Sequence, residues 1–226
     1  MAERLQLFAS FIFYRLHDGF RRLPPNEQMT AKQEFENIIS SHQERIFLRT
    51  YMTAGLSSES DLMIWRMSRR ISRLQEISAS ALKSGLGSWL LPVKEYLGIL
   101  SFEPSGPAES AEQEANSALG RFPYMMLQPV KKNDGWHSLG EKEKSQFFLE
   151  REKVLKKYRN VTENIFSSYG LDWQDFIIQR EADAASDLEA VTGELRLIEN
   201  KEYTVSGCHS QFCIGRDLSE ILDYLA

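Results

Sequence analysis

An internal repeat constrains the fold of this chain more than any other feature. The pair Gly55-Leu56 is followed by the segment DLMIWR at residues 61–66, and Gly170-Leu171 is followed by DFIIQR at residues 175–180. Hydrophobic periodicity predicts the same order of elements around both segments: strand, helix, strand, strand, helix, strand. A chain that carries this order twice is expected to fold as two similar halves.

This order is typical of a ferredoxin-like unit, whose helices cover only one face of its sheet. The other face must pack against a second sheet, and two sheets that face each other form a barrel. We therefore predict an α+β fold in which two fused ferredoxin-like repeats, residues 1–102 and 121–226, form an antiparallel α+β barrel. Residues 103–120 are predicted to be a flexible linker, because Pro104, Gly106 and Pro107 precede a run of Glu, Ser and Ala with little to bury.

The same periodicity gives approximate bounds for the individual elements. Strands are predicted at residues 5–14, 46–54, 61–66, 93–102, 122–129, 158–168, 173–180 and 203–214. Helices are predicted at residues 27–41, 67–83, 184–198 and 218–225, and from Ser138 or Gly140 to residue 157.

Composition and charge exclude several classes of protein. The chain has 42% hydrophobic and 26% charged residues, as an ordinary globular protein has. Its net charge of −5 argues against general nucleic-acid binding, which relies on basic surface. Since no apolar run approaches the ~20 residues that cross a bilayer, we expect no membrane segment. Cys208 and Cys213 would point to opposite faces of one strand, which predicts reduced thiols and a cytoplasmic location.

Common catalytic and ligand-binding motifs are not found. The chain has no Walker phosphate loop, and Gly85-Leu86-Gly87 lacks the third glycine of a dinucleotide fingerprint. No Cys/His group has zinc spacing. The four histidines, at positions 17, 42, 137 and 209, are far apart and are more typical of surface residues than of a catalytic group.

A set of short segments, in a fixed order, resembles the chlorite dismutase family, which includes chlorite dismutases, coprohaem decarboxylases and related haem peroxidases. In the first half these segments are residues 51–54 and 61–65 and Tyr96-Leu97-Gly98. In the second half they are Pro129, Val130, Lys132, Trp136-His137-Ser138-Leu139, Phe147-Phe148, the strand at residues 158–168, Gly170-Leu171-Asp172, Leu195-Arg196 and Glu199.

The resemblance implies the fold of the dimeric α+β barrel superfamily and a homo-oligomer, expected to be a pentamer. It also implies haem or coprohaem as cofactor, held in the C-terminal repeat, and the activity of a haem-dependent oxidoreductase. Five residues occupy the family's pocket positions: Gln128, Lys132, Trp136, Arg151 and Asn164. Lys132 matches a lysine near the haem carboxylates, although an ordinary surface lysine explains it equally well.

Three of these positions depart from the family's pattern. The iron-binding histidine falls on Arg151, whose guanidinium stays protonated and cannot bind iron. Tyr158 is a second, weaker candidate for the iron ligand, and it is expected to have entered the following strand. The decarboxylases have a tyrosine where this chain has Gln128, and chlorite-degrading enzymes have an arginine where this chain has Asn164.

These departures leave three hypotheses open. The first is a haem protein with altered ligation, whose activity is in doubt. The second is a haem-free member that binds a small anion through Arg151, Gln128, Asn164 and Lys132. The third is a structural, oligomeric protein. A surface salt bridge from Arg151 to Glu150, Glu152 or Asp175 is the alternative to a role in a pocket.

Overall fold

The computed structural model describes residues 5–43, 45–102, 119–198, 203–207 and 209–225. The N-terminal half contains β1 (Leu5–Leu16), α1 (Pro25–Gln43), β2 (Phe47–Met52), β3 (Leu62–Ser68), α2 (Ile71–Leu82) and β4 (Leu90–Phe102). The C-terminal half contains β5 (Tyr124–Val130), α4 (Asp134–Ser138), α5 (Glu141–Leu155), β6 (Val161–Ser167), β7 (Phe176–Ala182), α6 (Ala185–Ile198), β8 (Gln211–Gly215) and α7 (Leu218–Leu225).

The eight strands form one closed antiparallel barrel, in the order β1-β3-β2-β8-β5-β7-β6-β4. Within each half the strands pair over long stretches, as β6 and β7 do over seven residue pairs. The two halves join at two short seams. Tyr51 and Met52 of β2 pair with β8 at one seam, and Ile99 of β4 pairs with Ser167 of β6 at the other. The predicted α+β barrel is confirmed.

The two halves repeat the same loop in atomic detail. Gly55 and Gly170 both have the left-handed backbone that favours glycine, with φ of +77° and +80°. The amide of Thr53 donates to the carbonyl of Asp61 at 2.9 Å, and the amide of Ser168 donates to the carbonyl of Asp175 at 2.8 Å. The internal repeat read from the sequence therefore corresponds to a repeated structure.

Several predicted bounds are wrong. Met67 and Ser68 extend β3 and do not begin the next helix, because Met67 packs inside the barrel. Strand β8 begins at Gln211 and not at residue 203, because Gly207, with φ of +102°, turns the chain before it. Tyr158 precedes β6, which begins at Val161. The short helix α4 was not predicted. Most of the predicted linker, residues 103–118, lies outside the described residues.

The barrel interior is filled by aromatic and aliphatic side chains. The indole of Trp65 lies at its centre, with ring centroids 4.5 Å from Phe47 and 5.3 Å from Phe11. Phe166 brings a further ring from the C-terminal half to 6.1 Å. Cys213 is buried in the same cluster as a free thiol, and Cys208 lies outside the described residues. This interior core joins the two halves, because both contribute to it.

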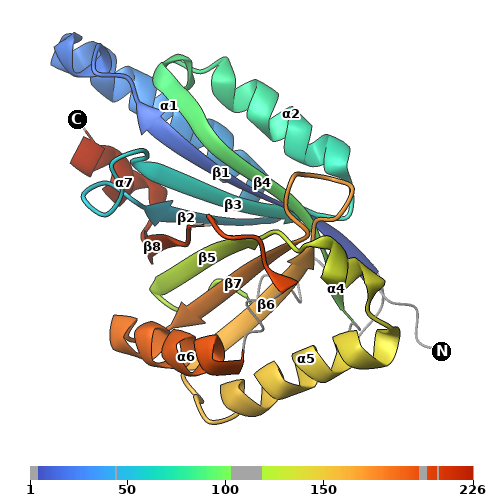
Figure 1. Ribbon diagram of the computed structural model, residues 1–226. Coiled ribbons are helices and arrows are strands. Elements are labelled where there is room, and N and C mark those ends of the chain that lie inside the picture. Colours follow the sequence, from blue (N-terminus) through green and yellow to red (C-terminus); the bar gives the residue numbers. More distant parts are fainter. Residues whose placement is uncertain (1–4, 44, 103–118, 199–202, 208, 226) are drawn as a thin grey trace.

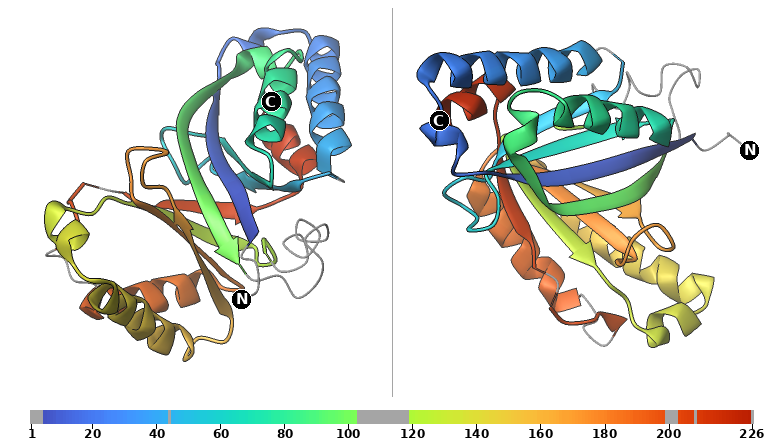
Figure 2. Two further views of the ribbon diagram at one scale, coloured as in Figure 1. Left: turned by 90° about the vertical axis from the view of Figure 1, so that its right-hand side faces the viewer. Right: turned by 90° about the horizontal axis from the view of Figure 1, so that it is seen from above.

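The helices cover the outer face of the barrel in two groups, which Figure 1 shows above and below the strands. Helices α1 and α2 cover the N-terminal half, and α5 and α6 lie over the C-terminal half. Helix α7, at the end of the chain, crosses to the N-terminal half and lies beside α1 (Figure 2). Its apolar residues pack with Phe35 and Ile39 of α1; they are Leu218, Ile221, Leu222 and Leu225. No helix in the described part of the chain is long and apolar enough to span a membrane.

A carboxyl group lies inside the barrel and gives a testable pH dependence. Burial raises the pKa of Glu181, and the amide of Arg121 and the hydroxyl of Tyr51, which donate to it, offset this only in part. Because the folded state favours the protonated carboxyl, the stability from Glu181 is fully present below the ordinary pKa of a glutamate. It is lost as pH rises from there through the raised pKa of the folded state.

Replacing Glu181 with Gln should therefore raise the urea midpoint at pH 7 and leave it almost unchanged at pH 4. The amide oxygen can accept the backbone amide of Arg121, the NH₂ group can donate to the hydroxyl of Tyr51, and the side chain carries no charge to desolvate. Urea unfolding at several pH values checks this result. Glu220→Gln, at an exposed ion pair with Arg216, is the control and should change little. A lower midpoint at pH 7 for Glu181→Gln would contradict the argument.

Candidate functional site

A narrow pocket lies between α5 and the outer face of the C-terminal half of the sheet. Its open volume is about 60 Å³, room for a few water molecules. Most of the lining is aromatic or aliphatic, with a few polar groups among it. The lining residues are Gln128, Val130, Lys132, Trp136, Phe147, Phe148, Arg151, Ile165, Phe176, Ile178, Ile198 and Thr204.

Helix α4 carries Trp136 to this pocket, and Lys132 lies just before the helix. Asn133 caps the helix, because its side-chain oxygen accepts the amide of Trp136 at 3.2 Å. The ammonium of Lys132 lies 4.6 Å from the centre of the Trp136 ring and donates to the hydroxyl of Thr204 at 3.0 Å. Lys132 thus presents its charge at the pocket, where the sequence also allowed an ordinary surface position.

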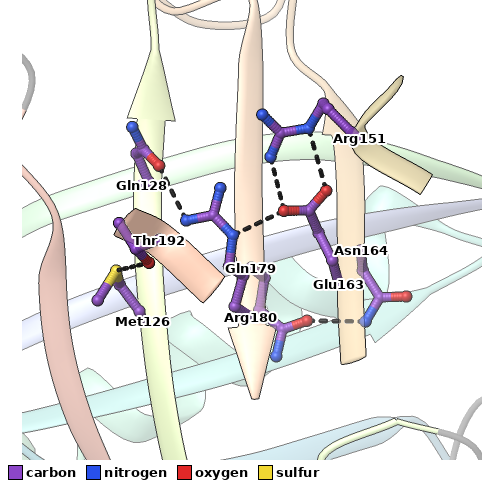
Figure 3. A network of polar contacts seen from close by, with 8 residues as sticks. All are labelled: Met126, Gln128, Arg151, Glu163, Asn164, Gln179, Arg180 and Thr192. Atoms are coloured by element: carbon purple, nitrogen blue, oxygen red, sulfur yellow. Dashed lines mark hydrogen bonds and ion pairs between the residues drawn. The ribbon is translucent and has the colours of Figure 1, made fainter. Parts of the chain in front are cut away.

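Arg151 points from α5 toward the sheet and forms a bidentate ion pair with Glu163 of β6 (Figure 3). Its Nη2 lies 2.6 Å from Oε2 of Glu163, and its Nε lies 3.2 Å from Oε1. The side chains of Arg151 and Glu163 are only 10% and 2% exposed. The alternative prediction for Arg151, a surface salt bridge to Glu150, Glu152 or Asp175, is replaced by this ion pair with a buried carboxylate.

Glu163 also binds a second arginine. Nε of Arg180, on β7, lies 2.6 Å from Oε2 of Glu163, and its Nη1 donates to Oε1 of Gln128 at 3.1 Å. We call the group Arg151, Glu163, Arg180 and Gln128 the arginine network. It contains two guanidinium groups that share one carboxylate, and two of its members, Gln128 and Arg151, line the pocket.

Asn164 does not belong to this pocket, contrary to the sequence prediction. Successive side chains of a strand point to opposite faces of the sheet. Glu163 and Ile165 face α5, so Asn164 between them faces the barrel interior. There its amide donates to Gln179 at 2.8 Å (Figure 3). Ile165 takes the place in the lining that was predicted for Asn164.

Tyr158 is directed away from the pocket. It follows α5, and its hydroxyl donates to Glu194 of α6 at 2.9 Å, a bond that raises the pKa of Tyr158. Glu163 and Arg180 were missed by sequence reasoning. The signal that could have found them is a charged residue in the middle of each of two predicted strands, because such a residue needs a partner when it is buried.

A family model described as chlorite dismutase matches residues 28–218. The chain belongs to the chlorite dismutase family. Among curated relatives, chlorite dismutase from Ideonella dechloratans is 22% identical over 213 residues, which is 88% of this chain and 72% of that protein. Family membership agrees with the resemblance seen in the sequence.

Solved structures of the family share the fold. Chlorite dismutase from Candidatus Nitrospira defluvii, in complex with imidazole, has a TM-score of 0.83 at 22% identity, covering 97% of this chain and 94% of that one. A protein described as a novel heme-binding protein from Thermus thermophilus has a TM-score of 0.82 at 16% identity, covering 100% of this chain and 97% of that one.

The pocket of this family member does not fit haem. Iron in haem proteins is held by His, Cys, Met or Tyr, and none of the lining residues in the described part of the chain is of these types. An open volume of about 60 Å³, with room for only a few water molecules, is also far smaller than a haem group. Of the five residues predicted for the site, the lining brings together Gln128, Lys132, Trp136 and Arg151.

Proposed function

We propose that this chain is a chlorite dismutase-like protein that binds a small organic anion, such as a short-chain carboxylate, and does not hold haem iron. The observation that carries the proposal is the make-up of the pocket, where cationic and amide groups border an apolar space. The resemblance in sequence implies that the family's iron ligand lies on the helix that is α5 here, at the position of Arg151. A guanidinium there favours a negative partner and would repel a ferric ion.

Three groups are suited to hold the anion. The ammonium of Lys132 supplies the positive charge, and the hydroxyl of Thr204 lies 3.0 Å from it. Gln128 accepts from Arg180 through Oε1, so its NH₂ group is the donor that remains for a ligand. The aromatic walls formed by Trp136 and Phe176 suit a short apolar tail and exclude water from the charged end.

A haem-dependent oxidoreductase is the second candidate, and family membership and the heme-binding relative favour it. It requires α5 to move away from the sheet and a ligand from outside the lining. The pentameric assembly implied by the family is likewise a proposal, to be tested by light scattering.

Titration of the purified protein with haem and with coprohaem separates the two candidates. We expect no saturable, shifted Soret band. Arg151→His is the informative variant, because it returns an imidazole to α5 and would gain such a band if the pocket can open. A saturable band in the unmodified protein would overturn the haem-free assignment.

Binding of acetate, butyrate and butylamine, followed by NMR, tests the anion site directly. Butyrate should bind and butylamine should not. Lys132→Met should weaken butyrate about tenfold, the loss expected for one charge-assisted contact worth about 1.4 kcal/mol. Lys156→Met, at the exposed C-terminal end of α5, is the matched control and should leave binding unchanged. Equal affinity in Lys132→Met would contradict the assignment of the anion to this pocket.

A further inference from the structure

One of the two carboxylate oxygens of Asp175 takes no part in holding the loop between β6 and β7. The residue is 1% exposed. Its Oδ2 accepts the amide of Lys132 at 2.6 Å, and Lys131 lies 3.5 Å from the same oxygen. Its Oδ1 has no hydrogen-bond donor among the described residues, and Nε2 of His137 lies 3.4 Å from it. A buried carboxylate oxygen directed at an imidazole calls for an explanation.

The N-terminal repeat provides an internal control. Asp61 is the counterpart of Asp175, and its backbone amide donates to Tyr14 as that of Asp175 donates to Val130. Oδ2 of Asp61 accepts the amide of Leu16 at 2.8 Å, the contact that Lys132 makes in the C-terminal repeat. One oxygen is therefore enough to hold this loop. Within the described residues no ion pair joins Asp61 to a histidine, so the imidazole is an addition of the C-terminal repeat.

We infer that His137 and Asp175 are positioning residues that hold Lys132 and Trp136 in place at the anion pocket, and that protonation of His137 tightens this hold. We call the two residues the His137–Asp175 clamp. The inference rests on the proposed function, because the pocket that the clamp positions is the proposed anion site. The class of ligand whose affinity it controls is the small organic anion.

The geometry of α4 links the clamp to the pocket. His137 and Trp136 are adjacent on α4, and the same carboxylate that faces His137 binds the amide of Lys132. Trp136, Phe148 and Phe176 line the anion pocket on one side and, on the other, a more open pocket of about 240 Å³ that contains His137 and Asp175. A change in the clamp therefore acts on the wall that the two pockets share.

The charged and titratable groups around His137 come from four segments. Asp134 lies on α4 itself, Glu141 and Lys144 on α5, Lys131 after β5, and Tyr169 and Asp175 on the loop between β6 and β7. The ring of Tyr169 packs 5.2 Å from that of His137. Of these groups, Asp175 is the buried one that can form a charge-assisted hydrogen bond with the protonated imidazole. Deprotonation removes that ion pair and leaves the carboxylate buried, which loosens α4.

Butyrate affinity measured from pH 5.5 to pH 8 tests the inference, since butyrate stays ionised throughout. Affinity of the unmodified protein should fall about tenfold over this range. His137→Gln should give a flat profile, and His137→Lys, which keeps a positive charge, should stay near the low-pH affinity. His42→Gln, in the last turn of α1, is the control and should keep the full pH dependence. A profile in His137→Gln as steep as that of the unmodified protein would overturn the clamp.

A ligand-free measurement separates failure of the clamp from failure of the proposed function. The indole N–H signal of Trp136, assigned by its loss in Trp136→Phe, should shift with pH and lose that shift in His137→Gln. If this signal titrates but butyrate does not bind, the clamp stands and the proposed function has failed. If butyrate binds and neither its affinity nor the Trp136 signal responds to His137, the clamp is refuted.

Discussion

Replacing Glu163 with Ala is expected to lower the free energy of unfolding by about 3–5 kcal/mol. The carboxylate bridges the guanidinium groups of Arg151 and Arg180, and all three side chains are buried or nearly so. Removal of the Glu163 carboxylate leaves the guanidinium groups of Arg151 and Arg180 poorly solvated and without the counter-ion that they share. Urea unfolding at pH 7 measures the loss.

Two controls show whether the loss comes from burial of the charges. Glu152→Ala removes the exposed partner of Lys156 on the same helix and should cost well under 1 kcal/mol. The triple variant Arg151→Met, Glu163→Leu and Arg180→Met replaces the network with apolar side chains and should recover most of the lost stability. If Glu163→Ala costs no more than Glu152→Ala, the arginine network is not a buried charge cluster.

Replacing Trp65 with Ala is expected to cost about 3–5 kcal/mol, the usual loss when a large buried side chain is truncated. Trp65 is fully buried at the centre of the barrel, between Phe11 and Phe47. Its removal leaves a cavity that the closed ring of strands cannot collapse to fill. Urea unfolding at pH 7, with the slope compared between variants, checks both the midpoint and the cooperativity.

Trp173→Ala is the matched control, because Trp173 is 51% exposed and should lose less than about 0.5 kcal/mol. Trp65→Phe should cost much less than Trp65→Ala. It keeps a ring in place and removes an indole N–H that has no hydrogen-bond partner among the described residues. A loss below that of Trp173→Ala would mean that Trp65 is not at the centre of a packed interior.

The fold could be predicted from the sequence because the internal repeat depends on residues that lie close together in the chain. Gly55 and Gly170 mark a backbone that favours glycine, and Asp61 and Asp175 directly precede the strands that follow. These signals lie within a few residues of each other, so they can be recognised from the sequence alone. The end of the second repeat was predicted less well, since Tyr203 and Thr204 have strand-like sequence but contribute only an isolated bridge to Lys132.

The site was predicted in part, and the errors have one physical cause. Counting from Trp136 places Arg151 on the face of α5 that points toward the sheet. On a helix, a small error in the count does not move a side chain to the opposite face. Across the loop after α5, the face of each β6 residue depends on a register that changes with every single residue. Asn164 was therefore assigned to the pocket when Glu163 and Ile165 face it. Partners on separate strands, such as Glu163 and Arg180, require the register before they can be paired.

The position of α7 makes the two halves of the duplicated fold differ in structure. Its side chains fill the space between α1 and the sheet in the N-terminal half, and the corresponding space under α5 in the C-terminal half is the pocket. The last helix of the chain therefore fills this space in the N-terminal half. A duplicated fold would otherwise offer two equivalent spaces between a helix and the sheet. Because α7 fills one of them, the proposed anion site under α5 has no counterpart under α1 in the described residues.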